Sequence, residues 1–346
     1  MRRTRTLVIG LLVVLAVGVL AGVVRVPLVA LGPGPTFDTL GAVDGKPVVS
    51  ITGRQTYPTT GHLNMTTVAV TDGLTAVTAL EFWADPEREL VPRAAIYPPG
   101  KSDQQVEQEN TTQFTDSEND AEVAALSYLH EPVKVVVGPL SAGAPAANVL
   151  KEGDQLLSVK GQPVTSPGQV SQILTTTRPG DQIPVSFQRG DAPATQGTVT
   201  VGARPAIAGR PDGPQGFLGI TPEGRPADPN QIVISLGDIG GPSAGLAFAL
   251  AVIDKLTPDD LTGGKFVAGT GQIGPTGVVS PIGGIPLKMI AARHAGATVF
   301  LVPAANCAEA AANTPAGLQL IKVTNLSDAV DSLTALKQNR PAPSCS

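Results

Sequence analysis

A serine in a glycine-rich turn and a lysine further along the chain are the residues whose types and settings could do chemistry. Ser243 lies in the segment Gly240–Gly245 (G-G-P-S-A-G), directly before an apolar run over residues 246–253 that we expect to be helical. A hydroxyl there faces unpaired backbone N–H groups and the positive end of the helix dipole, which stabilise developing negative charge. The backbone amides of Gly241, Ser243 and Ala244 are the candidate donors to an oxyanion. The same turn also fits a plain helix cap, or a loop that holds a phosphate.

The lysine is Lys288, which follows Pro286 and is flanked by Leu287, Met289 and Ile290. Proline is favoured at the first positions of a helix, so Lys288 is predicted in a first turn among apolar neighbours. Burial disfavours an ammonium group and lowers its pKa, by up to about 3–5 units in extreme cases. The neutral amine could then take a proton from a serine. A lysine in a first turn is otherwise solvent-exposed, and this residue alone leaves both interpretations open.

Together the two motifs resemble the proteolytic domain of the Lon family, in which G-P-S-A-G carries the nucleophile and P-I-G-G-[LI]-x-x-K-x-x-A-A carries the lysine. The matching segments here are Gly241–Gly245 and Pro281–Ala292. The resemblance implies that Ser243 is the nucleophile and Lys288 the general base, with Thr270, in a T-G-x-I turn, supporting the lysine. It covers about residues 214–338 and implies the α+β fold of the second domain of ribosomal protein S5.

The sequence departs from the Lon pattern at one position. Lon proteases carry an aspartate two residues before the proline of G-P-S, and this chain has Gly240 there. Asp238 is a nearby acid that could take over its role. The departure keeps open the alternative that the Lon-like domain is inactive and that the chain is a non-catalytic adaptor.

Residues 131–205 resemble the PDZ family of peptide-binding domains. The resemblance rests on the order A-P-A-A from Ala144, E-G-D-x-L-L-S-V from Glu152 and x-G-x-P-V from Lys160, with a helix expected over 166–176 and a strand over 182–189. It implies capture of a peptide as an added strand. The carboxylate-binding loop of that family is not evident here, so a spacer that positions the next domain is the alternative.

The N-terminus has the pattern of a membrane anchor. The 18 residues from Leu7 to Val24 carry no charge and follow Arg2, Arg3 and Arg5. This length is near the minimum for a spanning helix, and the arginines should stay on the cytoplasmic side. We expect a single-pass protein of the cell membrane with an extracytoplasmic catalytic domain. A cleaved signal peptide and a buried helix of a soluble protein are the alternatives.

The combination of one membrane helix, a PDZ-like domain and a Lon-type domain resembles the bacterial PDZ-containing Lon-like proteases. It implies an ATP-independent serine endopeptidase that cleaves extracytoplasmic or membrane-associated proteins, with the PDZ-like domain for substrate capture or gating, and a homo-oligomeric ring as a family-based expectation.

We divide the chain into a basic start and anchor (1–31), an N-terminal region (32–130), the PDZ-like domain (131–205), the Lon-type domain (206–340) and a tail (341–346). Residues 63–70 are predicted to be a strand and 121–129 a helix of the protease fold, which would make the PDZ-like domain an insertion. Residues 32–60 are expected to be rich in turns and 102–119 to be a surface loop.

Composition excludes other functions. The net charge is −5, with 24 Lys and Arg and no basic stripe, so nucleic acid is not an expected partner. A P-loop motif is absent from the sequence, and a small-molecule kinase would need ATP bound elsewhere. The three histidines, His62, His130 and His294, are not clustered with cysteines or carboxylates, so no metal and no cofactor are expected. Cys307 and Cys345 could form one disulfide in an oxidising compartment or stay as free thiols.

Overall fold

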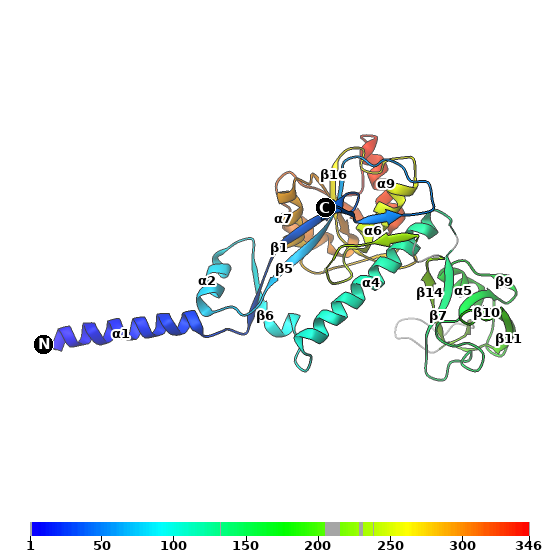
Figure 1. Cartoon of the computed structure of the whole chain (residues 1–346), viewed down its shortest axis with the longest axis horizontal. Coiled ribbons are helices and arrows are strands. Elements are labelled where there is room, and N and C mark those ends of the chain that lie inside the picture. Colours follow the sequence, from blue (N-terminus) through cyan, green and yellow to red (C-terminus); the bar gives the residue numbers. More distant parts are fainter. Residues whose placement is uncertain (1, 132, 205–214, 228–230, 238, 346) are drawn as a thin grey trace.

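The computed structural model consists of an N-terminal helix, a six-stranded mixed sheet with helices on both faces, and a smaller β unit (Figure 1). It describes residues 2–131, 133–204, 215–227, 231–237 and 239–345. The fold is therefore of the mixed α and β class that the sequence predicts.

The central sheet has the strand order β20-β19-β16-β5-β1-β6. Its first four strands run parallel, and β1 and β6 pair antiparallel at one side. The strands are β1 (Leu28–Asp38), β5 (His62–Thr71), β6 (Glu89–Pro92), β16 (Phe266–Gly269), β19 (Val299–Pro303) and β20 (Gln319–Val323).

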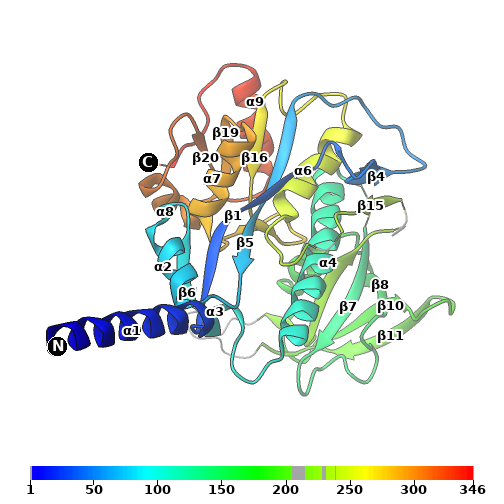
Figure 2. The same ribbon diagram turned by 60° about the vertical axis from the view of Figure 1, so that its left-hand side comes forward.

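The core forms because side chains alternate between the two faces of this sheet. On β19, Val299 and Leu301 face α6 (Gly245–Leu256), while Phe300 and Val302 face α7 (Ile285–Ala295). Residues 245–254 of α6 are all buried, as expected for a helix that is apolar all round. The helices α4 (Asp103–Tyr128) and α9 (Leu326–Lys337) cover α6, and α8 (Cys307–Ala312) lies beside α7 (Figure 2).

The smaller unit, here called the PDZ-like unit (residues 133–225), has its own sheet and its own core. Its strands are β7 (Lys134–Leu140), β8 (Gln155–Val159), β9 (Gln162–Pro163), β10 (Gln182–Gln188), β11 (Thr195–Thr200) and β14 (Ile220–Arg225), and its helix is α5 (Pro167–Leu174).

The PDZ-like unit extends past the predicted boundary at residue 205, because β14 completes its sheet by pairing with β7, Arg225 opposite Lys134. The strand β5, which contains the predicted strand 63–70, lies in the central sheet, and α4, which contains the predicted helix 121–129, packs on α6. Segments on both sides of the PDZ-like unit thus build the central domain.

Two sequence expectations are wrong. Residues 102–119 are not a loop, because α4 begins at Asp103 with a capping box between Ser102 and Gln105. Residues 32–35 (G-P-G-P) do not form turns but lie within β1, where a bulge between Pro33 and Thr36 accommodates the prolines.

The remaining elements are short. They are β2 (Ala42–Val43), β3 (Lys46–Pro47), β4 (Val49–Ile51), α2 (Ala76–Ala84), α3 (Arg93–Ile96), β12 (Gly202–Ala203), β13 (Gly216–Phe217), β15 (Ile232–Ile234), β17 (Gln272–Ile273), β18 (Val279–Ser280) and a 3-10 turn (Ala304–Asn306).

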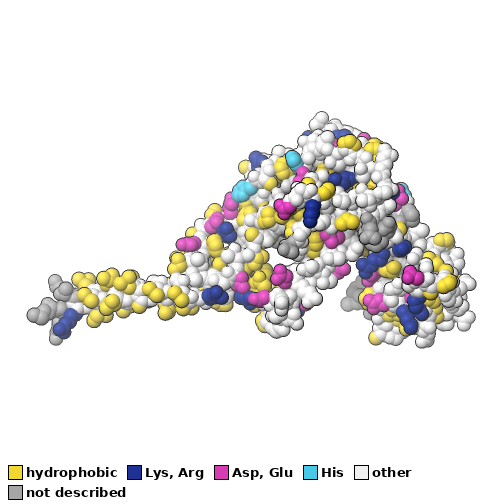
Figure 3. Space-filling view, viewed as in Figure 1, with side chains coloured by type: hydrophobic (Ala, Val, Ile, Leu, Met, Phe, Trp, Pro, Cys, Tyr) yellow, Lys and Arg dark blue, Asp and Glu magenta, His cyan; other side chains and the backbone are white. Residues whose placement is uncertain are grey.

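The N-terminal helix α1 (Arg2–Val23) projects from the rest of the molecule, and apolar side chains cover it (Figure 3). Within it, Arg5–Val23 is long and apolar enough to cross a membrane, a property that a signal sequence shares. At the other end of the chain, a disulfide joins Cys307 to Cys345 and ties the tail to α8.

The packing of α6 against α4 gives a first prediction. Phe248 is fully buried and meets Phe114 edge to face, with 5.7 Å between ring centroids. The Phe248→Ala variant should lose about 3–5 kcal/mol, which lowers the Tm by about 6–20 °C for a domain of this size. Circular dichroism during heating in detergent micelles measures it. Val278→Ala, at a side chain that is 55% exposed, is the control and should change the Tm little. A Tm unchanged by Phe248→Ala would contradict the packing.

Candidate active site

Ser243 lies in the turn that leads into α6, one residue before the helix cap Ala244. Its backbone is held from the β16 side, because its carbonyl accepts hydrogen bonds from the Gly271 N–H (2.9 Å) and the Thr270 hydroxyl (3.1 Å). From the other side, Ser117 of α4 donates to the Pro242 carbonyl at 3.0 Å. The backbone that carries the Ser243 side chain is thus fixed by contacts to two separate parts of the chain.

Gly245, the first residue of α6, is required by close packing. A Cβ atom there would come within 2.7 Å of the Ser117 hydroxyl and 2.8 Å of a methyl group of Ile273. The glycine therefore lets α4 and the segment after Thr270 approach the start of α6.

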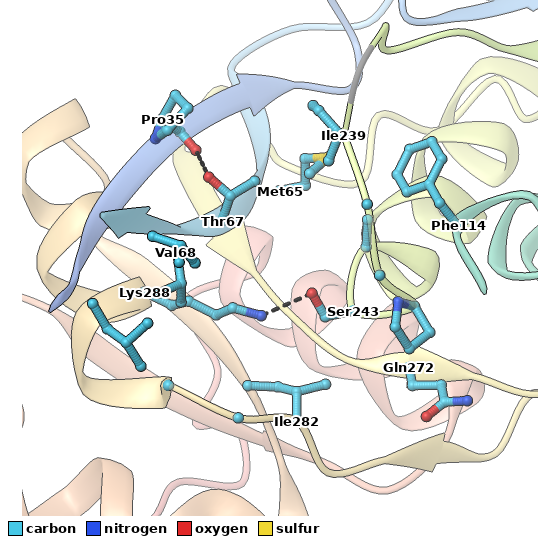
Figure 4. A pocket seen from close by; sticks show the side chains of 18 of the residues that line it. Pro35, Met65, Thr67, Val68, Phe114, Ile239, Ser243, Gln272, Ile282 and Lys288 are labelled. Atoms are coloured by element: carbon cyan, nitrogen blue, oxygen red, sulfur yellow. Dashed lines mark hydrogen bonds between the residues drawn. The ribbon is translucent and has the colours of Figure 1, made fainter. Parts of the chain in front are cut away.

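Lys288 reaches Ser243 from the opposite face of the sheet. It lies in the first turn of α7, which begins after Gly284 in the left-handed conformation (φ 69°), and it is 4% exposed. Its Nζ atom is 2.8 Å from Ser243 Oγ (Figure 4). The same atom is 3.1 Å from Thr270 Oγ1. The three side chains named by the sequence motifs therefore meet.

Burial lowers the pKa of Lys288 from its ordinary value to about 8. The neutral amine is then abundant in mildly alkaline solution, with its lone pair next to the Ser243 hydroxyl. Thr270, fully buried, accepts a hydrogen bond from Nζ and donates one to the Ser243 carbonyl. This chain of hydrogen bonds fixes the amine in a direction suited to a general base.

The predicted oxyanion donors are not equivalent. The Gly241 N–H donates to the Asn110 carbonyl of α4 at 2.9 Å, so this amide already has a partner, contrary to the expectation that it holds an oxyanion. Among the residues that the structure describes, no backbone carbonyl accepts from the amides of Ser243 and Ala244. These two amides are the donors left for a developing negative charge.

The glycine at position 240 also contacts α4. A Cβ atom there would lie 2.9 Å from the Asn110 side chain, so the helix occupies the space that a side chain at 240 would need. The alternative acid, Asp238, lies outside the described residues.

A cavity of about 770 Å³ opens in front of the Ser243 and Lys288 side chains (Figure 4). Apolar groups form most of its walls, and they come from β1, β5, α4 and the loop before α7. Asn306 fixes that loop, because its amide group both accepts from the Ile282 N–H and donates to the Ile282 carbonyl, each at 2.9 Å. The wall residues include Leu31, Phe37, Met65, Val68, Phe114 and Ile282.

The contributions of α4 to the site were missed from the sequence. Asn110, Phe114 and Ser117 all lie in the stretch expected to be a loop. The signal that could have revealed the helix is the sequence S-x-x-Q over residues 102–105, which is the signature of a capping box.

The histidines do not join this site. His62 pairs with Asp38 at 2.7 Å, and the His294 side chain is 59% exposed and lies 3.3 Å from Glu87. Within the described ranges, no group of three His, Cys, Asp or Glu side chains could hold a metal ion.

Comparisons with known proteins match the two domains separately. Residues 237–336 match the Lon protease (S16) C-terminal proteolytic domain, and residues 108–199 match the PDZ domain. Curated relatives include the Lon protease of Azospirillum brasilense, 31% identical over 179 residues, which are 51% of this chain and 20% of that protein. The Lon protease of Phenylobacterium zucineum is 37% identical over 119 residues, which are 33% of this chain and 15% of that protein. The chain thus spans about a fifth or less of the length of these relatives.

Among solved structures, the chain is similar to the PDZ domain of the SdrC-like protein from Listeria monocytogenes. That match has 24% identity and a TM-score of 0.22, and covers 25% of this chain and 85% of the other. The corresponding domain from Listeria innocua matches at 20% identity with a TM-score of 0.22, over 26% of this chain and 92% of the other.

The environment of Lys288 gives a second prediction. Because the side chain is buried, the pKa of its amine should be about 8, well below the ordinary lysine value of 10.5. Carbon-13 NMR of lysine-labelled protein measures this pKa, and the signal that disappears in Lys288→Met identifies the residue. Lys322, on β20, is exposed and provides a comparison signal in the same spectrum. A Lys288 titration midpoint near 10 would show that the amine is solvated.

Proposed function

We propose that this chain, which carries a PDZ domain and a Lon-type proteolytic domain, is a serine endopeptidase in which Ser243 is the nucleophile and Lys288 the general base. The observation that carries the proposal is the 2.8 Å separation between Lys288 Nζ and Ser243 Oγ, with the amine buried and the hydroxyl on the wall of a cavity. A serine and a base in hydrogen-bond reach, with a third group orienting the base, is the arrangement that nucleophilic catalysis needs.

The reaction follows from these contacts. Neutral Lys288 takes the proton of Ser243 as Oγ bonds to the carbonyl carbon of a peptide, and the amides of Ser243 and Ala244 hold the resulting oxyanion. When the C–N bond breaks, the lysine ammonium gives its proton to the leaving amine. Water then attacks the acyl-enzyme ester, Lys288 takes the proton of that water, and Ser243 Oγ leaves and recovers a proton from the lysine.

The cavity walls fit a peptide in extended form. The strand β5 pairs with β16 only as far as Met65, which lies opposite Gly269. Beyond Met65 this edge of β5 has no paired strand among the described residues. Thr67 and Val68, in this unpaired stretch, line the cavity. An extended substrate can pair with such an edge while its side chains enter the apolar space.

The remaining parts of the proposal concern the setting of the enzyme. We assign α1 as a single membrane anchor that holds an ATP-independent catalytic domain outside the cytoplasm, with protein substrates near or in the membrane. The PDZ-like unit captures or gates these substrates, and a homo-oligomeric ring is the proposed assembly. The competing function, a non-catalytic adaptor, is favoured only by the glycine at 240.

A third prediction tests the pair directly. Ser243→Ala and Lys288→Met should each lower the cleavage rate of an unfolded protein at least about 10³-fold, because nucleophile and base act as one unit. Lys255→Met is a matched control, since Lys255 is another lysine with a pKa lowered by burial, but it donates to the Leu40 carbonyl away from the cavity. A fluorophosphonate probe should label Ser243 in the parent protein and in the control. Undiminished cleavage by either site variant would end the proposal, and failure of the parent protein to cleave or to be labelled would support the adaptor.

A fourth prediction concerns Thr270. Thr270→Val removes the hydroxyl that orients the lysine, and we expect kcat to fall about 10–100-fold with little change in KM. The pH profile of kcat/KM should rise with pH and have its midpoint near the pKa of Lys288, about 8, because the ammonium form cannot accept a proton. Thr270→Ser keeps the hydroxyl and should restore most of the rate. Equal rates for the Val and Ser variants would contradict a role for the hydroxyl.

A further inference from the structure

The helix α2 (Ala76–Ala84) has an apolar face that no described part of the chain covers. Val77, Leu80 and Trp83 are 42%, 64% and 74% exposed, and their spacing of three residues sets them along one side of the helix. The opposite side packs on the protein, where Ala79 lies in a buried cluster with Ala30 and Leu74.

The exposed face is not a scattered surface feature. Apart from α1 and the residue that follows it, the described residues include six large apolar side chains that are exposed. Three are those of α2, and a fourth, Val70 at the end of β5, lines the cavity in front of Ser243 and Lys288. The other two, Val233 and Val278, lie singly in the central domain. The three apolar side chains gathered on one side of α2 therefore mark it as a surface that binds something.

The chain places α2 at the exit of the proposed membrane span. The 19 residues Arg5–Val23 extend about 28 Å as a helix, close to the thickness of a hydrocarbon core of about 30 Å. The Val26 N–H, three residues later, donates to the Leu74 carbonyl at 2.8 Å, and α2 begins two residues after Leu74. Three residues of chain reach at most about 11 Å, and each headgroup layer is about 5–8 Å thick, so α2 starts at or just beyond the headgroup layer.

The direction and composition of α2 also fit that layer. In Figures 1 and 2, α2 lies beside the C-terminal end of α1 and runs across its direction, which is along the membrane plane when α1 crosses it. Tryptophan is the residue most typical of the membrane–water interface, and Trp83 is the only tryptophan in the sequence. Glu81 lies at the flank of the apolar side and not between Val77, Leu80 and Trp83.

We propose that α2 is an interfacial helix that binds the bilayer crossed by α1, with Val77, Leu80 and Trp83 immersed between the lipid headgroups and the upper acyl chains. The inference rests on the proposed membrane anchor and goes beyond it, because a tethered domain need not touch the membrane. With two attachments, α1 and α2, the domain is held in one orientation. The strands β1 and β5, which join this end of the molecule to the cavity walls, then fix the active site at a set distance from the lipid.

The single tryptophan allows a direct test with the full chain. The protein is reconstituted in vesicles of equal parts phosphatidylcholine and phosphatidylglycerol, and flotation in a density gradient shows whether α1 has inserted. The phosphatidylcholine is then replaced by forms brominated either near the top or near the end of the acyl chains. We expect bromine near the top to lower the emission of Trp83 about twofold or more, and bromine near the chain ends to lower it much less.

Matched variants separate docking from tethering. The double change Val77→Glu and Leu80→Glu leaves Trp83 and α1 intact and should abolish the quenching while flotation persists. The control carries the same two changes at the exposed Val233 and Val278 and should be quenched like the parent protein.

The experiment distinguishes failure of the interfacial helix from failure of the membrane anchor. Flotation without quenching would overturn the interfacial helix and leave the anchor standing, while loss of flotation would overturn both. Emission at short wavelength that bromine does not quench, and that shifts to longer wavelength when the protein is diluted in the vesicles, would assign this face to a second copy of the chain and reject the lipid.

Discussion

A lysine amine that is shielded from water gives up its proton far more readily than one in solution, and the central domain is built so that Lys288 is shielded. The ammonium form loses its hydration in this site, so its pKa falls to about 8. In the described part of the chain its polar contacts are hydroxyl groups, those of Ser243 and Thr270, and no carboxylate is bonded to it. A carboxylate partner would favour the charged form and raise the pKa, which would remove the basic amine.

The need to shield the Lys288 amine from water explains the layered arrangement around the sheet. The serine turn comes from the start of α6 on one face, the lysine from the start of α7 on the other, and Thr270 follows β16 between them. The sheet edge where β16 ends is therefore the point at which both faces can contribute to one site. The helix α4 closes it, since its contacts with Pro242 and Gly241 hold the serine turn against β16.

The sequence predicted those features that depend on local chemistry. The helix after Ser243, the first-turn position of Lys288 and the strand of residues 63–70 follow from apolar periodicity, proline preference and β-branched residues. Their meeting in space could be expected only from the family resemblance, because spacing along the chain does not fix which sheet edge two helices share. The wrong prediction of a loop at 102–119 shows that local patterns can also miss a helix. The sequence of α4 is polar, and its helix depends on its cap and on the side chains that reach α6.

Two further differences between the sequence predictions and the structure arise from contacts between distant parts of the chain. The sheet of the PDZ-like unit continues past the expected boundary at residue 205 because β14 pairs with β7, about 90 residues earlier in the chain, and no local pattern encodes such a pairing. Gly241 was expected to hold an oxyanion because it lies two residues before the serine, but its amide donates to the carbonyl of Asn110. Local sequence indicates which groups are present, and tertiary contacts decide which of them are free.

The pairing of Arg225 with Lys134 has a consequence for how this architecture can vary. The first and last strands of the PDZ-like unit are neighbours, so the unit enters and leaves the central domain through adjoining points. A module with adjoining ends can be gained, exchanged or shortened in one genetic event without pulling apart the sheet that hosts it. The central domain and the PDZ-like unit are thus free to evolve at different rates, although a single continuous chain encodes both.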